Sequence, residues 1–270
     1  MLMKVLIDNI SKDDLVGEWG LSIYVEYKNK KYLLDTGTSG VFVENAEKMK
    51  VNLSKIDYGI LSHAHYDHAD GLKSFFEINH KAKFYMRKEC EENCYSIKDN
   101  EEKYIGIHKG YLEKFKNRIE YVDNDYEINE GVYLIGHKTE NLEEKGKTSF
   151  MYQKKGDKWQ FDNFNHEQSL VFDTKKGLVI FNSCCHAGAD TIVKEIERTF
   201  PNKKIHAIIG GFHLKDSTEE QMKDFALRMK EANVDKMITG HCTGEEGYKI
   251  LKEYLGDKIL QMYTGMEVEF

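Results

Sequence analysis

Short apolar runs alternate with polar turns along the chain, and the spacing of the apolar positions predicts which runs are strands. Before the first histidine, the pattern predicts strands over residues 4–9, 21–27, 31–35 and 58–61. Over residues 41–50 the apolar positions recur at helical spacing instead. The first part of the chain is therefore a set of strands with one helix, and its last strand runs directly into a group of histidines.

The middle of the chain carries weaker signals. We expect a helix over residues 69–78 and a strand over residues 83–86. A polar helix should follow, with Cys90 and Cys94 on one of its faces. From about residue 97 to residue 147 the sequence is polar and irregular, and we interpret this stretch as a variable insertion rather than a separate domain.

The last part of the chain is regular. Turn signals predict two hairpins, over residues 150–161 and 168–181. After them, expected helices alternate with expected strands over residues 189–200, 205–209, 217–232, 236–239, 245–255 and 259–270. Ser217 and Glu220 have the spacing of a capping box. Hairpins followed by helix–strand alternation predict one α/β domain over residues 1–270, with two mixed sheets face to face and helices outside.

The composition narrows the function classes. The chain has 270 residues, of which 40% are hydrophobic, enough for a sizeable core. Its net charge is -7 with both signs interspersed, so we expect no nucleic-acid partner. No apolar stretch approaches the roughly 20 residues of a membrane helix, and we expect no membrane partner. The absence of a secretory signal and the odd number of cysteines, five, favour free thiols in the cytoplasm.

The run SHAHYDHADG carries the strongest chemical signal. Imidazoles and carboxylates are the usual ligands of zinc and of catalytic iron or manganese. His63 and His65 point the same way in an extended segment, so both can coordinate one metal ion. If the chain then turns, Asp67 and His68 can face a second position. The alternative, a polar loop that merely contains histidines, rarely produces this spacing directly after a strand.

This run resembles the HxHxDH signature of the metallo-β-lactamase superfamily. A second signature, LLDTG, precedes it, and the resemblance implies that Asp35 supports the metal site from behind the ligands. The segments GLSIYVEY, EQSLVF, SCCHAG, GGFHL and TGHCTG resemble one branch, the "β-lactamase superfamily II" hydrolases. That branch includes an archaeal enzyme that joins a pterin to a ribofuranosylaminobenzene phosphate, so membership leaves the reaction open. The resemblance implies a four-layer αββα sandwich.

The resemblance also implies further ligands later in the chain. His186, after an expected strand, and His241, in TGHCTG, are expected metal ligands. Cys184 stands where many members carry a metal-bridging Asp, and it is either a ligand or a buried structural thiol. His213, in GGFHL, is expected near the substrate rather than on a metal. The missing bridging Asp leaves the count at one or two divalent ions, most simply zinc, with iron or manganese as alternatives.

The remaining histidines and cysteines receive no metal role. His166 lies where some members place a third histidine, but the suspected branch does not require one there. Cys185 and Cys242 are interpreted as packing residues. The histidines in polar or mid-strand contexts are interpreted as ordinary: His80, His108, His137 and His206.

Together these features predict a metal-dependent hydrolase acting on a small-molecule ester, lactone, thioester or phosphoester. The metal lowers the pKa of bound water to about 7, Asp67 can take a proton, and His213 can donate a hydrogen bond to the developing oxyanion. A transferase or synthase using a pterin-like phosphorylated substrate is an alternative. A non-enzymatic, metal-containing ligand-binding protein is another, opposed by the near-complete ligand set. The acidic charge opposes an RNA-processing nuclease, and His65 stands where a redox diiron protein prefers a carboxylate.

Overall fold

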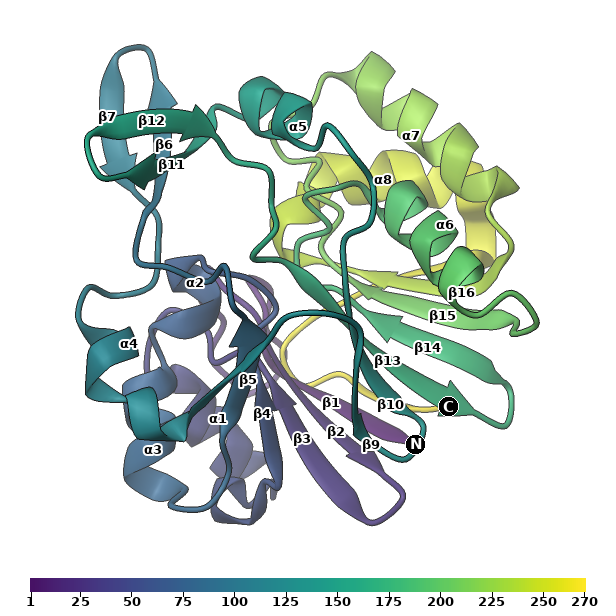
Figure 1. Cartoon of the computed structure of the whole chain (residues 1–270). Helices are drawn as coiled ribbons and strands as arrows, with labels where there is room; N and C mark the ends of the chain where they lie inside the picture. The colour runs from purple at the N-terminus through teal and green to yellow at the C-terminus, as the bar shows by residue number, and fades with distance from the viewer.

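The computed structural model describes residues 1–270 and contains two large sheets packed face to face, with helices on both outer faces (Figure 1). The strands of the first sheet are, in order across it, β18 (Glu267–Glu269), β1 (Leu2–Ile7), β2 (Ser22–Tyr27), β3 (Lys30–Leu34), β4 (Tyr58–Ile60), β5 (Phe84–Arg87) and β8 (Ile119–Val122). Those of the second are β17 (Ile259–Gln261), β16 (Val234–Thr239), β15 (Ile205–Gly210), β14 (Gly177–Phe181), β13 (Gln168–Thr174), β10 (Val132–Gly136) and β9 (Tyr126–Asn129). This architecture is the predicted αββα sandwich.

A third, small sheet stands outside the sandwich at the end where the metal ligands are expected (Figure 1). Its strands are β12 (Lys158–Phe161), β11 (Met151–Lys155), β6 (Cys94–Lys98) and β7 (Glu101–Tyr104). The α-helices are α1 (Val41–Lys48), α2 (Tyr66–Ala69), α3 (Leu72–Ile78), α4 (Tyr111–Lys114), α5 (Glu143–Thr148), α6 (Ala189–Thr199), α7 (Glu219–Glu231) and α8 (Gly244–Leu255). The short 3₁₀ helices are η1 (Leu53–Lys55), η2 (Lys116–Arg118), η3 (His241–Thr243) and η4 (Gly256–Lys258). None of the helices combines the length and the apolar character needed to cross a bilayer.

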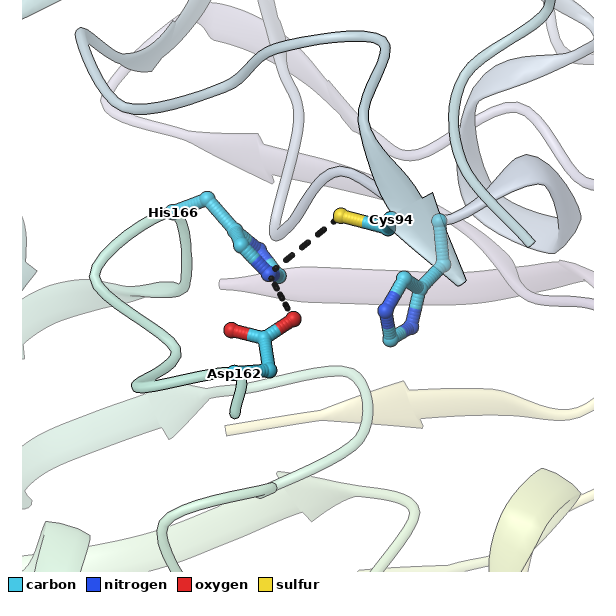
Figure 2. A group of neighbouring side chains, drawn as sticks. Cys94, Asp162 and His166 are labelled. Atoms are coloured by element: carbon cyan, nitrogen blue, oxygen red, sulfur yellow. Dashed lines mark hydrogen bonds and ion pairs between the residues drawn. The ribbon is translucent and has the colours of Figure 1, made fainter. Parts of the chain in front are cut away.

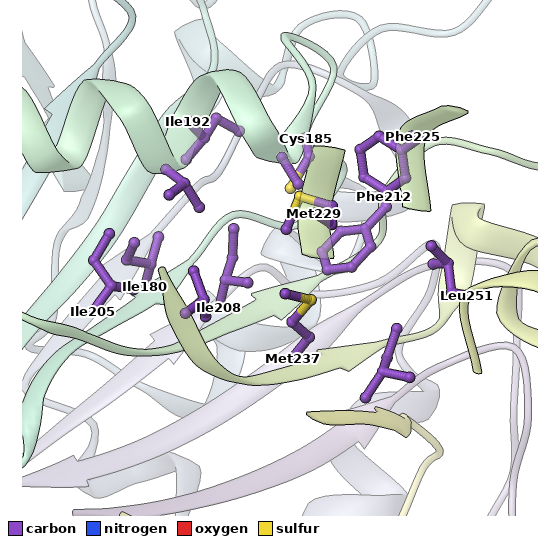
Figure 3. Close-up of a cluster of buried hydrophobic side chains, with 14 of the residues drawn as sticks. Ile180, Cys185, Ile192, Ile205, Ile208, Phe212, Phe225, Met229, Met237 and Leu251 are labelled. Carbon is purple, nitrogen blue, oxygen red and sulfur yellow. The ribbon is translucent and has the colours of Figure 1, made fainter. Parts of the chain in front are cut away.

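The core has three parts, which correspond to the three interfaces between layers. In β14, Val179 and Phe181 face the first sheet, whereas Leu178 and Ile180 face the helices of the second sheet. This alternation follows from the two-residue period of a strand, and burial on both faces explains why β14 reads as a continuous apolar run. Figure 3 shows Ile180 in the outer part of the core, with side chains from helices α6, α7 and α8 around the same cluster.

The predicted polar helix through Cys94 is wrong. Residues 94–98 form β6, which pairs with both β7 and β11, so Cys90 and Cys94 do not share a helical face. The turn after β6 explains the difference, because Asp99 and Asn100 have φ angles of 53° and 63°. Two successive left-handed residues form the tight turn of a hairpin, and Asp–Asn was an available signal for it.

The stretch of residues 97–147 also differs from the interpretation as inserted material. It contains β8, an edge strand of the first sheet, and β9 and β10 of the second sheet. Only β7, together with the end of β6, belongs to the small outer sheet. Two helix predictions change in detail as well. The helix expected over 69–78 begins later, as α3 at Leu72, and the separate short helix α2 precedes it. Helix α7 is capped by Thr218 and Gln221 rather than by Ser217 and Glu220.

The parallel part of the second sheet brings distant loops together. Strand β14 pairs in parallel with β15, and β15 with β16, so their carboxyl ends lie at one edge. In the first sheet, β3 and β4 are parallel and end together as well. Open sites form outside the carboxyl ends of such strands. Five loops that carry the candidate residues therefore meet at one end of the sandwich.

Candidate metal centre

The loop after β4 presents the first ligands. His63 and His65 have ring centroids 4.6 Å apart, and the centroid of His63 is 4.2 Å from that of His68. The chain turns into α2 directly after His65, which is the turn expected between the two ligand pairs. The short helix carries Asp67 and His68 toward the second position.

Asp35 orients two of these histidines. Its Oδ2 lies 2.7 Å from His68 Nδ1, and its two oxygens accept hydrogen bonds of 2.7 Å from the backbone and side chain of Ser62. Ser62 Oγ in turn lies 2.8 Å from His63 Nδ1. With both Nδ1 atoms occupied, the Nε2 atoms of His63 and His68 face the cluster. The supporting role expected for Asp35 matches this geometry, whereas the part played by Ser62 was not foreseen, although it directly precedes His63.

His186 joins His63 and His65 from the loop after β14. Its ring centroid is 4.9 Å from each of theirs, and the three side chains offer donor atoms within 4.8 Å of one another. The buried Glu167 fixes this loop, because its Oε1 accepts a 3.0 Å hydrogen bond from the His186 backbone N–H. The three histidines thus form one potential ligand set.

Asp67, His68 and His241 form a second set. Asp67 Oδ2 lies 3.3 Å from His241 Nε2 and 3.7 Å from His68 Nε2. His241 is held from behind by Asn9, whose Oδ1 lies 3.1 Å from Nδ1, and its backbone N–H donates 2.9 Å to the buried carboxylate of Asp8. Asp8 and Asn9 end the first strand, and the sequence offered no signal for either contact.

Cys184 lies between the two sets. Its Sγ is 3.3 Å from His68 Nε2 and falls within 4.8 Å of donor atoms of both His63 and His241. Cys242, interpreted from the sequence as packing, joins Cys184 and His241 in another group of donors. Glycine at position 211 is required here, because a Cβ on Gly211 would lie 2.4 Å from Cys242 Sγ. Cys184 thus occupies the central position that a bridging ligand would need.

The donor atoms fit divalent metal ions. His63 Nε2, His65 Nε2 and both ring nitrogens of His186 are buried without any hydrogen-bond partner, an arrangement that costs free energy unless something accepts their lone pairs. Burial lowers the pKa of His65 to about 3, so its ring is neutral and able to coordinate. In the second set, burial alone would lower the pKa of His241, but the Asp67 carboxylate, whose Oδ2 lies 3.3 Å from Nε2, raises it to about 9. A proton on His241 Nε2 balances the negative charge of the Asp67 carboxylate, as a bound metal cation would.

His213 lies beside the first set. It follows β15 with a φ of 50°, and its ring centroid is 4.5 Å from that of His186. Left-handed backbone is unusual for a residue other than glycine and is found at functional sites. Its Nδ1 is buried without a partner, and its ring lines the cavity above the ligands. His213 thus lies beside a candidate ligand, and its role near the substrate stays a prediction.

Figure 2 shows His166 beside Cys94 and Asp162, and these three side chains offer donor atoms within 4.8 Å of one another and of a donor atom of His65. Its Nδ1 accepts a 3.2 Å hydrogen bond from the backbone N–H of Ala64. The proton of the neutral ring is therefore on Nε2, which lies 3.0 Å from Asp162 Oδ2 and 3.7 Å from Cys94 Sγ. Nε2 could hold a metal ion only after losing this proton, as the Nε2 of His241 would. In this structure His166 fixes the backbone between two candidate ligands.

His137 also differs from its interpretation as an ordinary histidine. It is buried between Glu167 and Glu195, with ring nitrogens 2.7 Å and 2.9 Å from their oxygens. Glu167 also accepts a hydrogen bond from the His186 backbone. His137 therefore supports the loop that carries His186 indirectly, through Glu167. The other three histidines without assigned roles stay outside the cluster: His80, His108 and His206.

A cavity of about 560 Å³ opens above the cluster. Asp67, Cys184, His186, His213 and His241 are part of its wall. The volume is that of a small-molecule site. Several candidate ligands therefore line a cavity that is large enough for a small molecule.

Comparison with known proteins places this arrangement in a family. The model of the metallo-beta-lactamase superfamily matches residues 20–148. The crystal structure of Tm1679, described as a metal-dependent hydrolase of the beta-lactamase superfamily, is 32% identical and has a TM-score of 0.86, covering 100% of this chain and 99% of that one. The chain belongs to the metallo-β-lactamase superfamily.

Two further comparisons concern a sequence relative and a protein that shares the fold. A protein of Methanocaldococcus jannaschii named 7,8-dihydropterin-6-methyl-4-(beta-D-ribofuranosyl)-aminobenzene-5'-phosphate synthase is 27% identical over 298 residues, covering 100% of both chains. The Zn(2+)-bound PqqB from Methylobacterium extorquens shares the fold, with a TM-score of 0.59, 8% identity and 100% coverage of both chains. Relatives of full length therefore differ in the activity that their names state.

Proposed function

We propose that this protein is a metal-dependent hydrolase whose substrate is a small molecule. The observation that carries the proposal is the cluster of unpartnered, buried histidine nitrogens at the base of a cavity of about 560 Å³. Such nitrogens are stable only with a partner, and a divalent ion is the partner that several of them can share. The cavity then gives a substrate access to that ion.

Two groups of side chains would each hold one divalent ion. His63, His65 and His186 would hold one ion, and Asp67, His68 and His241 a second, with Cys184 between them. A divalent ion bound there polarises a carbonyl or phosphoryl oxygen and lowers the pKa of water. Nitrogen, oxygen and sulfur donors together favour zinc, with iron and manganese as alternatives.

Asp67 and His213 are the proposed catalytic residues. Asp67 lines the cavity, and His68 and His241 hold its pKa below the usual range against the effect of burial, so its carboxylate is ionised and available as a hydrogen-bond acceptor. His213 lies beside His186, where its ring can donate a hydrogen bond to an oxygen that gains negative charge. Ester, lactone, thioester and phosphoester bonds all develop such an oxygen when water attacks.

A synthase is the second candidate. The full-length similarity to a protein named as a synthase favours it, because 27% identity extends over both whole chains. In a synthase, the same metal ligands would activate one substrate toward another rather than toward water. The cavity would then have to hold two substrates.

One experiment tests the proposal and separates the candidates. Protein purified in metal-replete medium is analysed for bound transition metals and then screened with phosphodiesters, lactones and thioesters in water labelled with heavy oxygen. A hydrolase binds one or two ions per chain and incorporates label into the product. Metal content below about a tenth of an equivalent contradicts the metal centre. A product that forms from two substrates without label supports the synthase.

A further inference from the structure

Residues of the small outer sheet line one side of the cavity above the candidate metal centre. Lys98 of β6 and Lys103 of β7 line the same cavity as His65, His186 and His241. A molecule that reaches the metal ligands therefore also meets this sheet. Residues of the sheet can therefore contact a molecule bound in the cavity.

The cavity has an excess of unpaired positive charge. Lys98, Lys103 and Lys215 line it, and none of the three has a carboxylate oxygen within 4.0 Å of its ammonium nitrogen. The carboxylates in the wall are Asp67, which belongs to the metal centre, and Asp216. In a chain of net charge -7, where many lysines form ion pairs, three unpaired lysines around one cavity indicate a negatively charged ligand.

Lys215 is fixed beside the metal centre. Its ammonium nitrogen lies 4.0 Å from the centroid of the Trp19 ring, and that ring lies 4.9 Å from the His241 ring. Its backbone N–H donates 3.1 Å to the carbonyl oxygen of Cys242. An aromatic face holds an ammonium group without neutralising it. Lys215 is thus a positioned charge, connected through Trp19 to a candidate metal ligand.

The three lysines come from three separate elements and face one volume. Lys98 and Lys103 reach it from the outer sheet, and Lys215 reaches it from the loop after β15. Hydroxyl groups of Ser96 and Ser149 line the same wall and can donate hydrogen bonds. Ammonium groups bind phosphate as point charges, and three of them suit a dianion better than a single carboxylate.

We propose that Lys98, Lys103 and Lys215 form an anion subsite that binds the phosphate monoester group of a small-molecule substrate. The proposal deepens the proposed function and rests on it for the reaction, since the bond that reacts would lie at the metal centre while the phosphate stays bound to the lysines. The phosphate group then positions the substrate and is not itself cleaved.

The test measures binding of phenyl phosphate to the full-length protein by calorimetry, once with metal and once after treatment with a chelator. The cavity variant carries Lys98→Met, Lys103→Met and Lys215→Met. We expect its affinity for phenyl phosphate to fall roughly tenfold or more in both states, because three charge pairs are lost. The affinity of the wild-type protein should fall with increasing salt more steeply than that of the variant.

A matched control removes the same charge elsewhere. Lys158→Met, Lys175→Met and Lys176→Met change three lysines that do not line the cavity, so the net charge equals that of the cavity variant. This control should bind phenyl phosphate as the wild type does. Equal affinity of wild type, control and cavity variant would overturn the anion subsite.

The same samples separate the two proposals. Metal content, measured in each, tests the metal centre and is expected to be unchanged by the lysine substitutions. Lysine-dependent binding in a protein that takes up no metal would support the subsite and contradict the hydrolase. Metal uptake together with phosphate binding that does not depend on the three lysines would support the metal centre and contradict the anion subsite.

Discussion

Replacement of His137 by glutamine removes a buried charge that supports the metal-ligand loop. In the folded protein His137 lies between the carboxylates of Glu167 and Glu195, at 2.7 Å and 2.9 Å, and Glu167 also holds the His186 backbone at 3.0 Å. Burial alone would lower the pKa of His137, but the hydrogen bonds with the two glutamates raise it to about 9. Glutamine keeps a donor there and loses the charge.

The pKa difference sets the size and the pH range of the effect. The pKa rises from the ordinary value of 6.5 to about 9, and each unit corresponds to about 1.4 kcal/mol, so the protonated ring contributes about 3 kcal/mol to the free energy of unfolding. Because the folded pKa is the higher one, this contribution is fully present below about pH 6.5. It is lost as the pH rises through about 9.

Urea unfolding of wild type and His137→Gln between about pH 6 and pH 10 measures this contribution. The wild type should exceed the variant most near pH 6, and the gap should shrink by about 3 kcal/mol toward pH 10. His206→Gln, which breaks a partly exposed pair with Asp235 at 3.0 Å, serves as the control for the loss of a histidine–carboxylate pair near the surface. A gap between wild type and His137→Gln that stays constant over this range would refute the reasoning.

Three further substitutions test the site itself. His65→Ala should abolish activity and weaken metal binding, whereas His80→Ala, on the exposed surface, should do neither; equal behaviour in metal analysis and kinetics would mean that the motif is not the site. His213→Ala should keep full metal content and lower kcat by roughly a hundredfold, and loss of metal would make His213 a ligand instead. Asn9→Ala removes the 3.1 Å partner of His241 Nδ1 and should weaken binding of the second ion by roughly tenfold or more in equilibrium dialysis, while unchanged affinity would show that Asn9 does not orient the ligand.

The sequence contained enough local information to predict which candidate ligands lie close together. His63, His65 and Asp67 lie within five residues, so their relative placement depends on one short segment. His186 and His241 each follow a strand and lie in turns, and parallel strands carry such turns to one edge of a sheet. The fold class followed from the order of hairpins and helices in the same way.

The contacts that orient the ligands could not be predicted, because they join residues far apart in the chain. Asn9 and His241 are separated by 232 positions, and His137 and Glu167 by 30. No periodicity relates such pairs, and only the packed sheets bring them together. The error at Cys94 has a different origin. A spacing of four residues fits a helix, but the Asp99–Asn100 turn gives the chain a hairpin instead.

Anomalous diffraction from crystals of protein purified in metal-replete medium tests the metal centre most directly. The account predicts one or two anomalous peaks, at coordination distances of about 2.0–2.3 Å from the ligand atoms. The first peak should contact His63, His65 and His186, and a second should contact Asp67 and His241. Peaks absent from both positions, or a single peak bound by Cys94, Asp162 and His166 instead, would contradict it.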